Sequence, residues 1–155
     1  MNRPKSFKRV EKRLTGGRSV STTAETSKRM GRVRRHGTTP ELVARSVVSS
    51  LGVRYTLKNR DLPGSPDLAN RTRRFAIFIN GCFWHRHPGC SRATVPKRNR
   101  RFWQAKFSRN VERDAKVVAA LKKIDFRVAV IWECQLLNPH SARVQIGRFL
   151  GMPVT

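Results

Sequence analysis

Four residues in the sequence have the types and spacing of a metal site. Cys82, His87 and Cys90 lie close together in a segment rich in Gly and Pro, and Cys134 is the third and last cysteine of the chain. Three thiolates and one imidazole fill the tetrahedral shell of Zn²⁺ and leave no open position, so the predicted role is structural. The alternative is three unrelated buried thiols beside a surface histidine. Zinc is the better prediction because residues 80–98 are too polar to pack as a core and need a cross-link.

Two further side chains point to hydrolysis of a phosphodiester. Asp67 follows Pro66 and comes directly before a predicted strand, and nucleases use such a carboxylate to hold Mg²⁺, which prefers oxygen ligands and polarises the phosphate. Judged alone, a turn-capping aspartate is the simpler interpretation of Asp67. His85 lies between Cys82 and His87, so a zinc-bound loop would fix its backbone, and its neutral imidazole would be able to take a proton from water. A surface histidine or a spare zinc ligand explains His85 equally well.

The same loop carries aromatic residues among basic ones. Phe83 and Trp84 are adjacent, and Trp103 follows on a predicted helix. Exposed aromatic side chains among arginines can wedge between the base steps of DNA. For Trp103, a place in the hydrophobic core is the more common alternative.

The charge of the chain indicates a polyanionic partner. Thirty-four Lys and Arg residues against nine Asp and Glu residues give a formal charge of +25, and the resulting self-repulsion is relieved when a polyanion binds. Nucleic acid is the predicted partner, although charge does not separate an enzyme from a ribosomal or chromatin-type protein or a membrane-surface peptide. No run approaches the ~18 apolar residues of a membrane span, and residues 1–10 lack the apolar stretch of a signal peptide. We therefore expect a cytoplasmic protein without a membrane partner, whose three cysteines are thiols or metal ligands.

A single domain must position these residues, because 155 residues with 38% hydrophobic content can bury one modest core. Residues 1–24 are basic and aperiodic, which predicts a disordered or DNA-tracking arm, and residues 25–155 are the predicted nuclease domain. Apolar periodicity and turn residues predict helices over 39–51 (capped by Thr39), 99–124 (one long helix or two in series) and 138–150, and strands over 53–57, 67–69, 75–79 and 127–134. This order predicts an α/β domain with a mixed central sheet flanked by helices. The nearly continuous apolar strand 75–79 is typical of a sheet covered on both faces.

Taken together, these residues and their order resemble the very-short-patch repair (Vsr) family of DNA mismatch endonucleases. The resemblance runs from about residue 26 to 134 and is carried by the stretches Ser27–Met30, Pro40–Leu42, Leu62–Asp67, Gly81–His85, Asn110–Asp114 and Val130–Cys134. The stretch Gly81–His85 with the His and Cys that follow it is specific. The resemblance implies a PD-(D/E)XK-like nuclease fold and a Mg²⁺-dependent enzyme that nicks DNA beside a T:G mismatch left by deamination of 5-methylcytosine.

The resemblance also implies catalytic and metal-binding roles for single residues. Asp67 is implied as the Mg²⁺-binding carboxylate, together with the backbone carbonyl of Ile79. His85 is implied as the catalytic histidine, Asp114 as the carboxylate that orients it, and Glu41 as an acid near the metals through water. The implied ligands of the structural Zn²⁺ are Cys82, His87, Cys90 and Cys134.

The implied partner is double-stranded DNA with a T:G mismatch, bound by a monomer, and other mismatch-repair proteins are implied as further partners. The implied DNA-binding residues are the intercalating aromatics Phe83, Trp84 and Trp103, Met30 from the N-terminal arm, and Lys106 and Asn110, which helical spacing places on the same face as Trp103.

One departure from the family bears on activity. Where this sequence has Ile79 and Asn80, mismatch-repair members carry a hydroxyl residue and a histidine. Ile79 still offers a backbone carbonyl to a metal, but Asn80 cannot titrate as histidine does. Two alternatives stay open: a zinc-stapled DNA-binding protein that does not cut, and a restriction-like nuclease of the same fold. The acidic residues favour an enzyme, because binding alone requires no carboxylate facing a phosphate.

Overall fold

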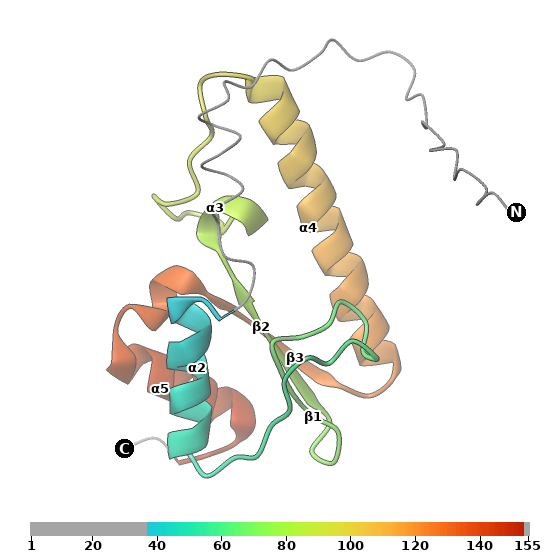
Figure 1. Cartoon of the computed structure of the whole chain (residues 1–155), viewed down its shortest axis with the longest axis vertical. Coiled ribbons are helices and arrows are strands. Elements are labelled where there is room, and N and C mark those ends of the chain that lie inside the picture. The colour runs from blue at the N-terminus through green and yellow to red at the C-terminus, as the bar shows by residue number, and fades with distance from the viewer. Residues whose placement is uncertain (1–36, 154–155) are drawn as a thin grey trace, which may run out of the picture.

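A three-stranded mixed sheet forms the centre of the structure, a computed structural model that describes residues 37–153 (Figure 1). The middle strand is β2 (Phe75–Asn80), with β1 (Leu68–Asn70) antiparallel on one side and β3 (Arg127–Trp132) parallel on the other. The helices are α2 (Thr39–Ser50), α3 (Cys82–His85), α4 (Arg100–Lys123), the 3₁₀ helix η1 (Glu133–Leu136) and α5 (Pro139–Leu150). The predicted α/β class with a mixed sheet and flanking helices is confirmed.

Helices cover both faces of this sheet (Figure 1). On one face, Val48 of α2 and Ile146 of α5 pack in one core cluster with Ile77 of β2. On the other face, Leu121 of α4 packs in a second cluster with Ala76. Successive residues of a strand point to opposite faces, so Ala76 and Ile77 lie on opposite faces of the sheet. Both side chains are fully buried, which requires both faces to be covered. The prediction from the apolar strand 75–79 is confirmed.

The strand directions bring three distant segments to one end of the sheet. Since β2 and β3 are parallel, with Asn80 paired to Trp132, the chain leaves both strands at the same end, at Gly81 and at Glu133. β1 is antiparallel to β2, so its beginning, next to Asp67, lies at that end as well. Residues that are far apart in sequence therefore gather there.

The helix predictions are confirmed with small shifts. The N-cap of α2 is Thr38, one residue before the predicted Thr39. Residues 100–123 form one continuous helix. The side chain of Asn138 caps α5 by accepting a hydrogen bond from the backbone N–H of Ser141 (3.0 Å). Within residues 37–153, no helix combines the length and the apolar character that a membrane crossing requires.

The predicted strand over residues 53–57 is wrong. Thr56 makes a single bridge with Ala69, and two residues later the chain turns at Lys58, whose φ of 56° is left-handed. A strand cannot continue through that conformation, so the segment leaves the sheet after one pair.

Two boundaries also differ from the prediction. Residues 80–98 are not irregular throughout, because they contain the short helix α3. The last strand ends at Trp132, so Cys134 lies in η1 and not in the strand. The predicted arm (residues 1–24) and Met30 lie outside the described residues.

Candidate active site and metal centre

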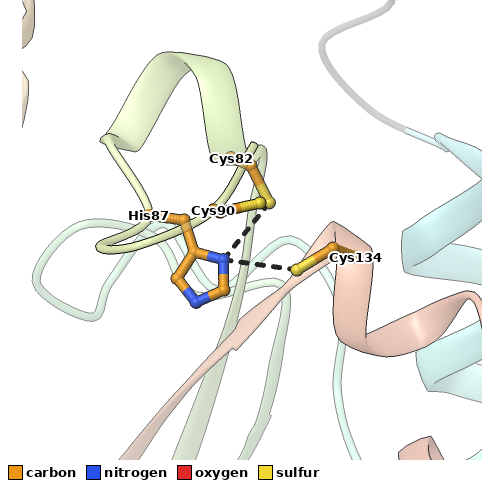
Figure 2. A group of neighbouring side chains, drawn as sticks. All are labelled: Cys82, His87, Cys90 and Cys134. Atoms are coloured by element: carbon orange, nitrogen blue, oxygen red, sulfur yellow. Dashed lines mark hydrogen bonds between the residues drawn. The ribbon is translucent and has the colours of Figure 1, made fainter. Parts of the chain in front are cut away.

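The four predicted zinc ligands meet in one cluster (Figure 2). Cys82 lies in α3, His87 and Cys90 lie in the loop that follows, and Cys134 lies in η1. Their ligand atoms all lie within 4.8 Å of one another. The Nδ1 atom of His87 is 3.5 Å from the Sγ of Cys82 and 3.2 Å from the Sγ of Cys134. Nitrogen and sulfur ligands of a tetrahedral Zn²⁺ are about 3.5 Å apart, so the size and donor set of the cluster fit this metal.

The topology of the sheet explains why these ligands meet. Cys82 follows the end of β2 by two residues and Cys134 follows the end of β3 by two, and the parallel pairing puts both ends side by side. The imidazole of His87 stacks on the indole of Trp132, with ring centroids 4.3 Å apart and an interplanar angle of 11°. This contact holds the ring of His87 in place.

Two thiols of the cluster, those of Cys82 and Cys90, have pKa values shifted in opposite directions. Burial raises the pKa of Cys82 to about 12, whereas a hydrogen bond from the backbone of Arg92 lowers the pKa of Cys90. A buried thiolate at Cys82 therefore needs a cation beside it, and a bound metal ion provides one.

A cavity of about 1030 Å³ opens at the same end of the sheet. Four of the nine acidic residues in the chain line it, namely Glu41, Asp67, Asp114 and Glu133. Its basic lining residues are His85, Lys106 and Arg113. Such a mixture, in a chain with a formal charge of +25, suits a metal ion and a phosphate bound together.

Asp67 is held against the end of β2. Its Oδ2 accepts a hydrogen bond of 2.7 Å from the backbone N–H of Ile79. The carboxylate of Asp67 therefore bonds to the backbone of β2 as a backbone carbonyl would, one residue before β1 begins. Asp67, Ile79 and Asn80 all line the cavity, so the structure brings together the two residues predicted to bind Mg²⁺.

Two side chains of α4 hold the short helix α3. The Oδ2 of Asp114 is hydrogen-bonded to the Nδ1 of His85, and the Nδ2 of Asn110 donates to the backbone carbonyl of Trp84 (3.0 Å). The other carboxylate oxygen of Asp114 accepts a bond of 2.9 Å from Arg113. When Nδ1 of His85 donates to Asp114, the lone pair is on Nε2, which is then the nitrogen that can accept a proton. The predicted pair of His85 and Asp114 is thus in contact.

The carboxylate of Glu41 is engaged at the start of α2. Its Oε2 accepts hydrogen bonds from the backbone N–H of Gly37 (2.9 Å) and from Arg45 (3.0 Å), and its Oε1 accepts one from the hydroxyl of Thr38 (2.9 Å). The contacts with Gly37 and Thr38 are those of a helix cap, and the contact with Arg45 is an ion pair within α2. Glu41 also lines the cavity, and its predicted place near the metals through water stays a prediction.

The aromatic residues form one cluster between α3 and α4. Phe83 meets Trp84, Trp103 and Phe107 edge-on, with ring centroids 5.0, 5.6 and 5.2 Å away. The ammonium group of Lys106 lies 5.0 Å from the centroid of Trp84 and 5.2 Å from that of Trp103. Trp103 is only 8% exposed, as the core alternative predicts, whereas Trp84 is partly buried and lines the cavity. Contact of Phe83 and Trp103 with DNA stays a prediction.

Two charged residues that line the cavity had no role in the sequence-based prediction. Arg113 precedes Asp114, and Glu133 precedes the predicted zinc ligand Cys134. A scarce acid beside a cysteine was the available signal for Glu133. The pairing of β2 with β3, however, is what brings Glu133 near Gly81. A Cβ atom added at Gly81 would lie 3.7 Å from the Oε2 of Glu133.

Comparison of the sequence with known proteins identifies the family. Residues 18–92 match the family model described as DNA mismatch endonuclease Vsr. The chain is 43% identical to the type II nicking enzyme V.XorIIP of Xanthomonas oryzae pv. oryzae over 121 residues, which are 78% of this chain and 88% of that protein. The chain belongs to the Vsr family. It is also 35% identical to the DNA mismatch endonuclease Vsr of Escherichia coli (73% of this chain and 72% of that protein) and 35% identical to the type II nicking enzyme V.NmeAIP of Neisseria meningitidis (84% and 93%).

Membership of the Vsr family makes the chain a DNA endonuclease, a hydrolase of phosphodiester bonds, with DNA as its partner. The resemblance drawn from the sequence is confirmed. The Vsr family model ends at residue 92, but the relatives extend the match over most of the chain.

Proposed function

We propose that the chain nicks one strand of DNA beside a T:G mismatch in a Mg²⁺-dependent reaction, with a structural Zn²⁺ beneath the active site. The observation that carries this proposal is the contact between His85 and Asp114 in the cavity that also contains Asp67. Hydrolysis of a phosphodiester requires a proton acceptor, here His85 oriented by Asp114, and an acid that can hold a metal, here Asp67. A non-catalytic DNA-binding protein has no use for either.

In this proposal Mg²⁺ is held by the carboxylate of Asp67 and the backbone carbonyl of Ile79. The residues fit this hard cation because the donors are oxygen atoms, and the bond from the N–H of Ile79 to Asp67 fixes the carboxylate in advance. When bound, Mg²⁺ supplies Lewis-acid stabilisation of the negative charge that develops on the phosphate. The pattern of Pro66 and Asp67 before β1 also supports assignment to the PD-(D/E)XK-like fold.

The protein's own residues move the proton. The Nε2 of His85 takes a proton from the attacking water, whose oxygen forms a bond to phosphorus while one P–O bond of the backbone breaks. Asp114 keeps the imidazole in the required tautomer and stabilises it once it is protonated. Arg113 and Lys106 line the same cavity and offer positive charge to the phosphate.

The direct test of nicking uses a DNA duplex with one T:G pair and a different label on each strand. With Mg²⁺ we expect a cut in one strand only, and with a chelator in place of Mg²⁺ we expect no cut. Binding of DNA without a cut at any Mg²⁺ concentration would instead support a non-catalytic DNA-binding protein with a structural zinc site. Cutting of both strands would support a restriction-like nuclease.

We further propose that Trp84 is the wedge that opens the mismatched step, because it is partly buried and lines the cavity. A mispaired step costs less to unstack than a paired one, so a wedge converts local weakness into selectivity. Trp84→Ala should therefore lose about 1–3 kcal/mol of the preference for T:G over paired DNA, with a smaller loss of general DNA affinity. The measurement is competition binding to the two duplexes.

Phe102 supplies a matched control for Trp84. It is 38% exposed on α4 and is not among the residues that line the cavity. Phe102→Ala should leave the preference for T:G unchanged. Equal losses on mismatched and paired DNA in Trp84→Ala would count against intercalation. At position 103 the suitable change is Trp103→Phe, which keeps an aromatic ring. Trp103→Ala would mainly lower stability, because it removes a side chain that is only 8% exposed.

A further inference from the structure

The segment that leads to Asp67 has no helix or strand to hold it. Residues 57–67 contain only turns, bends and irregular chain, and three of them, Lys58, Gly64 and Ser65, have left-handed φ angles of 56°, 71° and 51°. A metal-binding carboxylate must be held to a fraction of an ångström to be useful. The position of Asp67 therefore depends on contacts made by side chains of this loop.

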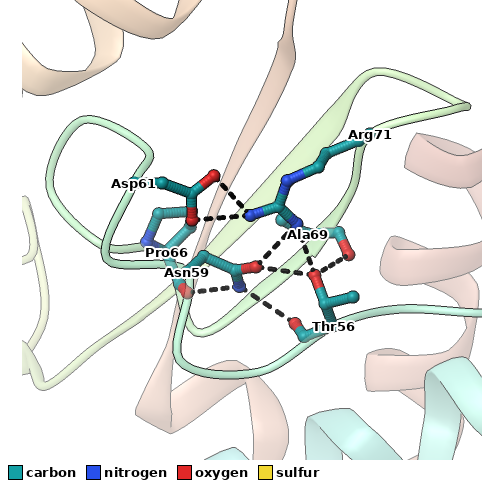
Figure 3. A network of polar contacts seen from close by, with 6 residues as sticks. All are labelled: Thr56, Asn59, Asp61, Pro66, Ala69 and Arg71. Carbon is teal, nitrogen blue, oxygen red and sulfur yellow. Dashed lines mark hydrogen bonds and ion pairs between the residues drawn. The ribbon is translucent and has the colours of Figure 1, made fainter.

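Asn59 makes those contacts at the centre of the loop (Figure 3). It is 1% exposed, and a buried carboxamide must be fully hydrogen-bonded. Its Nδ2 donates to the backbone carbonyls of Thr56 (2.9 Å) and Pro66 (3.0 Å). Its Oδ1 accepts from the hydroxyl of Thr56 (2.6 Å) and from Arg71 (3.2 Å). All four hydrogen-bonding positions of the carboxamide are in use.

The bond to Pro66 is the one that bears on the active site. The carbonyl of Pro66 belongs to the peptide group that joins it to Asp67, so Asn59 fixes the backbone from which the carboxylate of Asp67 extends. The far end of that side chain is fixed by the backbone N–H of Ile79 (2.7 Å). The backbone of Asp67 is thus fixed by Asn59, and its carboxylate is fixed by the N–H of Ile79.

Arg71 closes the network from the surface. Its guanidinium donates to both carboxylate oxygens of Asp61 (2.7 and 2.6 Å) and to the hydroxyl of Thr56 (2.9 Å). The hydrogen bond from Arg71 holds the pKa of Asp61 below its usual value. Both partners of this pair are largely exposed, and exposed ion pairs contribute little to stability. Of the polar side chains in this network, the buried carboxamide of Asn59 is therefore the one that contributes most to holding the loop.

We propose that Asn59 is a positioning residue for the metal-binding carboxylate: through the carbonyl of Pro66 it sets the place of Asp67 beside Ile79, and thereby the affinity for Mg²⁺. This inference rests on the proposed function, in which Asp67 holds the metal. Loss of a group that orients a metal ligand lowers metal affinity by about 10–100-fold.

The test is Asn59→Asp, which keeps the shape of the side chain but replaces the Nδ2 donor by an oxygen facing two carbonyls. The concentration of Mg²⁺ that gives half-maximal nicking should rise by about tenfold or more, and saturating Mg²⁺ should restore most of the rate. A second readout needs neither metal nor activity: hydrogen exchange of the Ile79 amide, measured by NMR, should become faster relative to that of Ile77, because its acceptor on Asp67 has moved.

Asn70→Asp is the matched control. Asn70 also donates from Nδ2 to a backbone carbonyl, that of Arg54 (2.8 Å), but it lies at the far end of β1 from Asp67. This variant should keep the Mg²⁺ requirement and the Ile79 exchange of the wild type. If Asn59→Asp does not fold, Thr56→Val removes one bond to the same carboxamide without adding charge, and it should shift both readouts in the same direction by a smaller factor.

The inference is overturned if a folded Asn59→Asp, or Thr56→Val in its place, matches Asn70→Asp in both readouts, even when its melting temperature is lower. Asp67→Ala separates the two failures. If Asp67→Ala still nicks at the rate of the wild type, the proposed function itself fails. If Asp67→Ala is inactive while Asn59→Asp needs no additional Mg²⁺, only the positioning role fails.

Discussion

Asp67→Ala should reduce Mg²⁺-dependent nicking by roughly a thousandfold or more, because a metal site supplies several kcal/mol of transition-state stabilisation and each 1.36 kcal/mol is a factor of ten in rate. Its affinity for DNA should fall little or even rise, since the change removes a negative charge from a cavity that receives phosphate. The Oδ2 of Asp67 accepts a hydrogen bond from the backbone N–H of Ile79. Single-turnover nicking and binding, measured on the same mismatched duplex, separate the two effects.

Glu112→Gln is the control for the loss of an acidic charge. Glu112 is an exposed residue of α4 that pairs with Lys116 (2.6 Å) and does not line the cavity that contains Asp67. Its variant should nick at the rate of the wild type. Undiminished nicking by Asp67→Ala would falsify the assignment of the metal-binding carboxylate.

The second large effect is expected at the proposed zinc site, from Cys134→Ser. Cys134 ties η1, at the end of β3, to α3, and α3 carries both Trp84 and His85. Loss of one ligand from a closed four-ligand site withdraws folding free energy. Cys134→Ser should lower the zinc content and also lower the melting temperature, by about 10 °C or more if a few kcal/mol are lost. It should reduce nicking as well, although Cys134 does not line the active-site cavity.

Metal analysis of the purified protein and melting curves check this prediction. About one zinc per chain in the wild type, and less in the variant, would support a structural role. After removal of zinc with a chelator, Mg²⁺ alone should not restore nicking, whereas zinc and Mg²⁺ together should. A zinc-free wild type that melts cooperatively and still nicks would contradict the account.

The metal cluster could be predicted from sequence because its signal is chemical and local. Cys82, His87 and Cys90 have the spacing of metal ligands, and Cys134 is the only cysteine left to complete the shell. The amphipathic helices and the apolar strand β2 could be predicted as well, because burial of one or both faces imposes a period on the sequence.

The rest of the site depends on pairings that no local pattern contains. Glu133 reaches the cavity only because β3 runs parallel to β2 with Asn80 opposite Trp132. The loop before Asp67 also lacks a periodic pattern, because its structure comes from the bonds of Asn59 to backbone carbonyls three and seven residues away. The apolar pattern around Thr56 predicts a strand, but the left-handed turn at Lys58 ends it after one pair.

The aromatic residues show a different limit. Helical spacing puts Trp103 on one face of α4 but does not say whether that face meets DNA or protein. In the structure, the rings of Phe83 and Phe107 cover it, so Trp103 is buried and Trp84 lines the cavity. The same aromatic residue types intercalate into DNA and fill hydrophobic cores, so tertiary packing decides which role a given side chain has.

The most direct test of the central claim is nicking of two DNA duplexes that differ only in a T:G or a C:G pair at one position, with Mg²⁺ present. The account predicts a cut in one strand beside the T:G pair, at least about tenfold faster than on the C:G duplex, because unstacking a paired step costs more than unstacking a mispaired one. Equal rates on both duplexes, or binding of the T:G duplex without any cut, would contradict it.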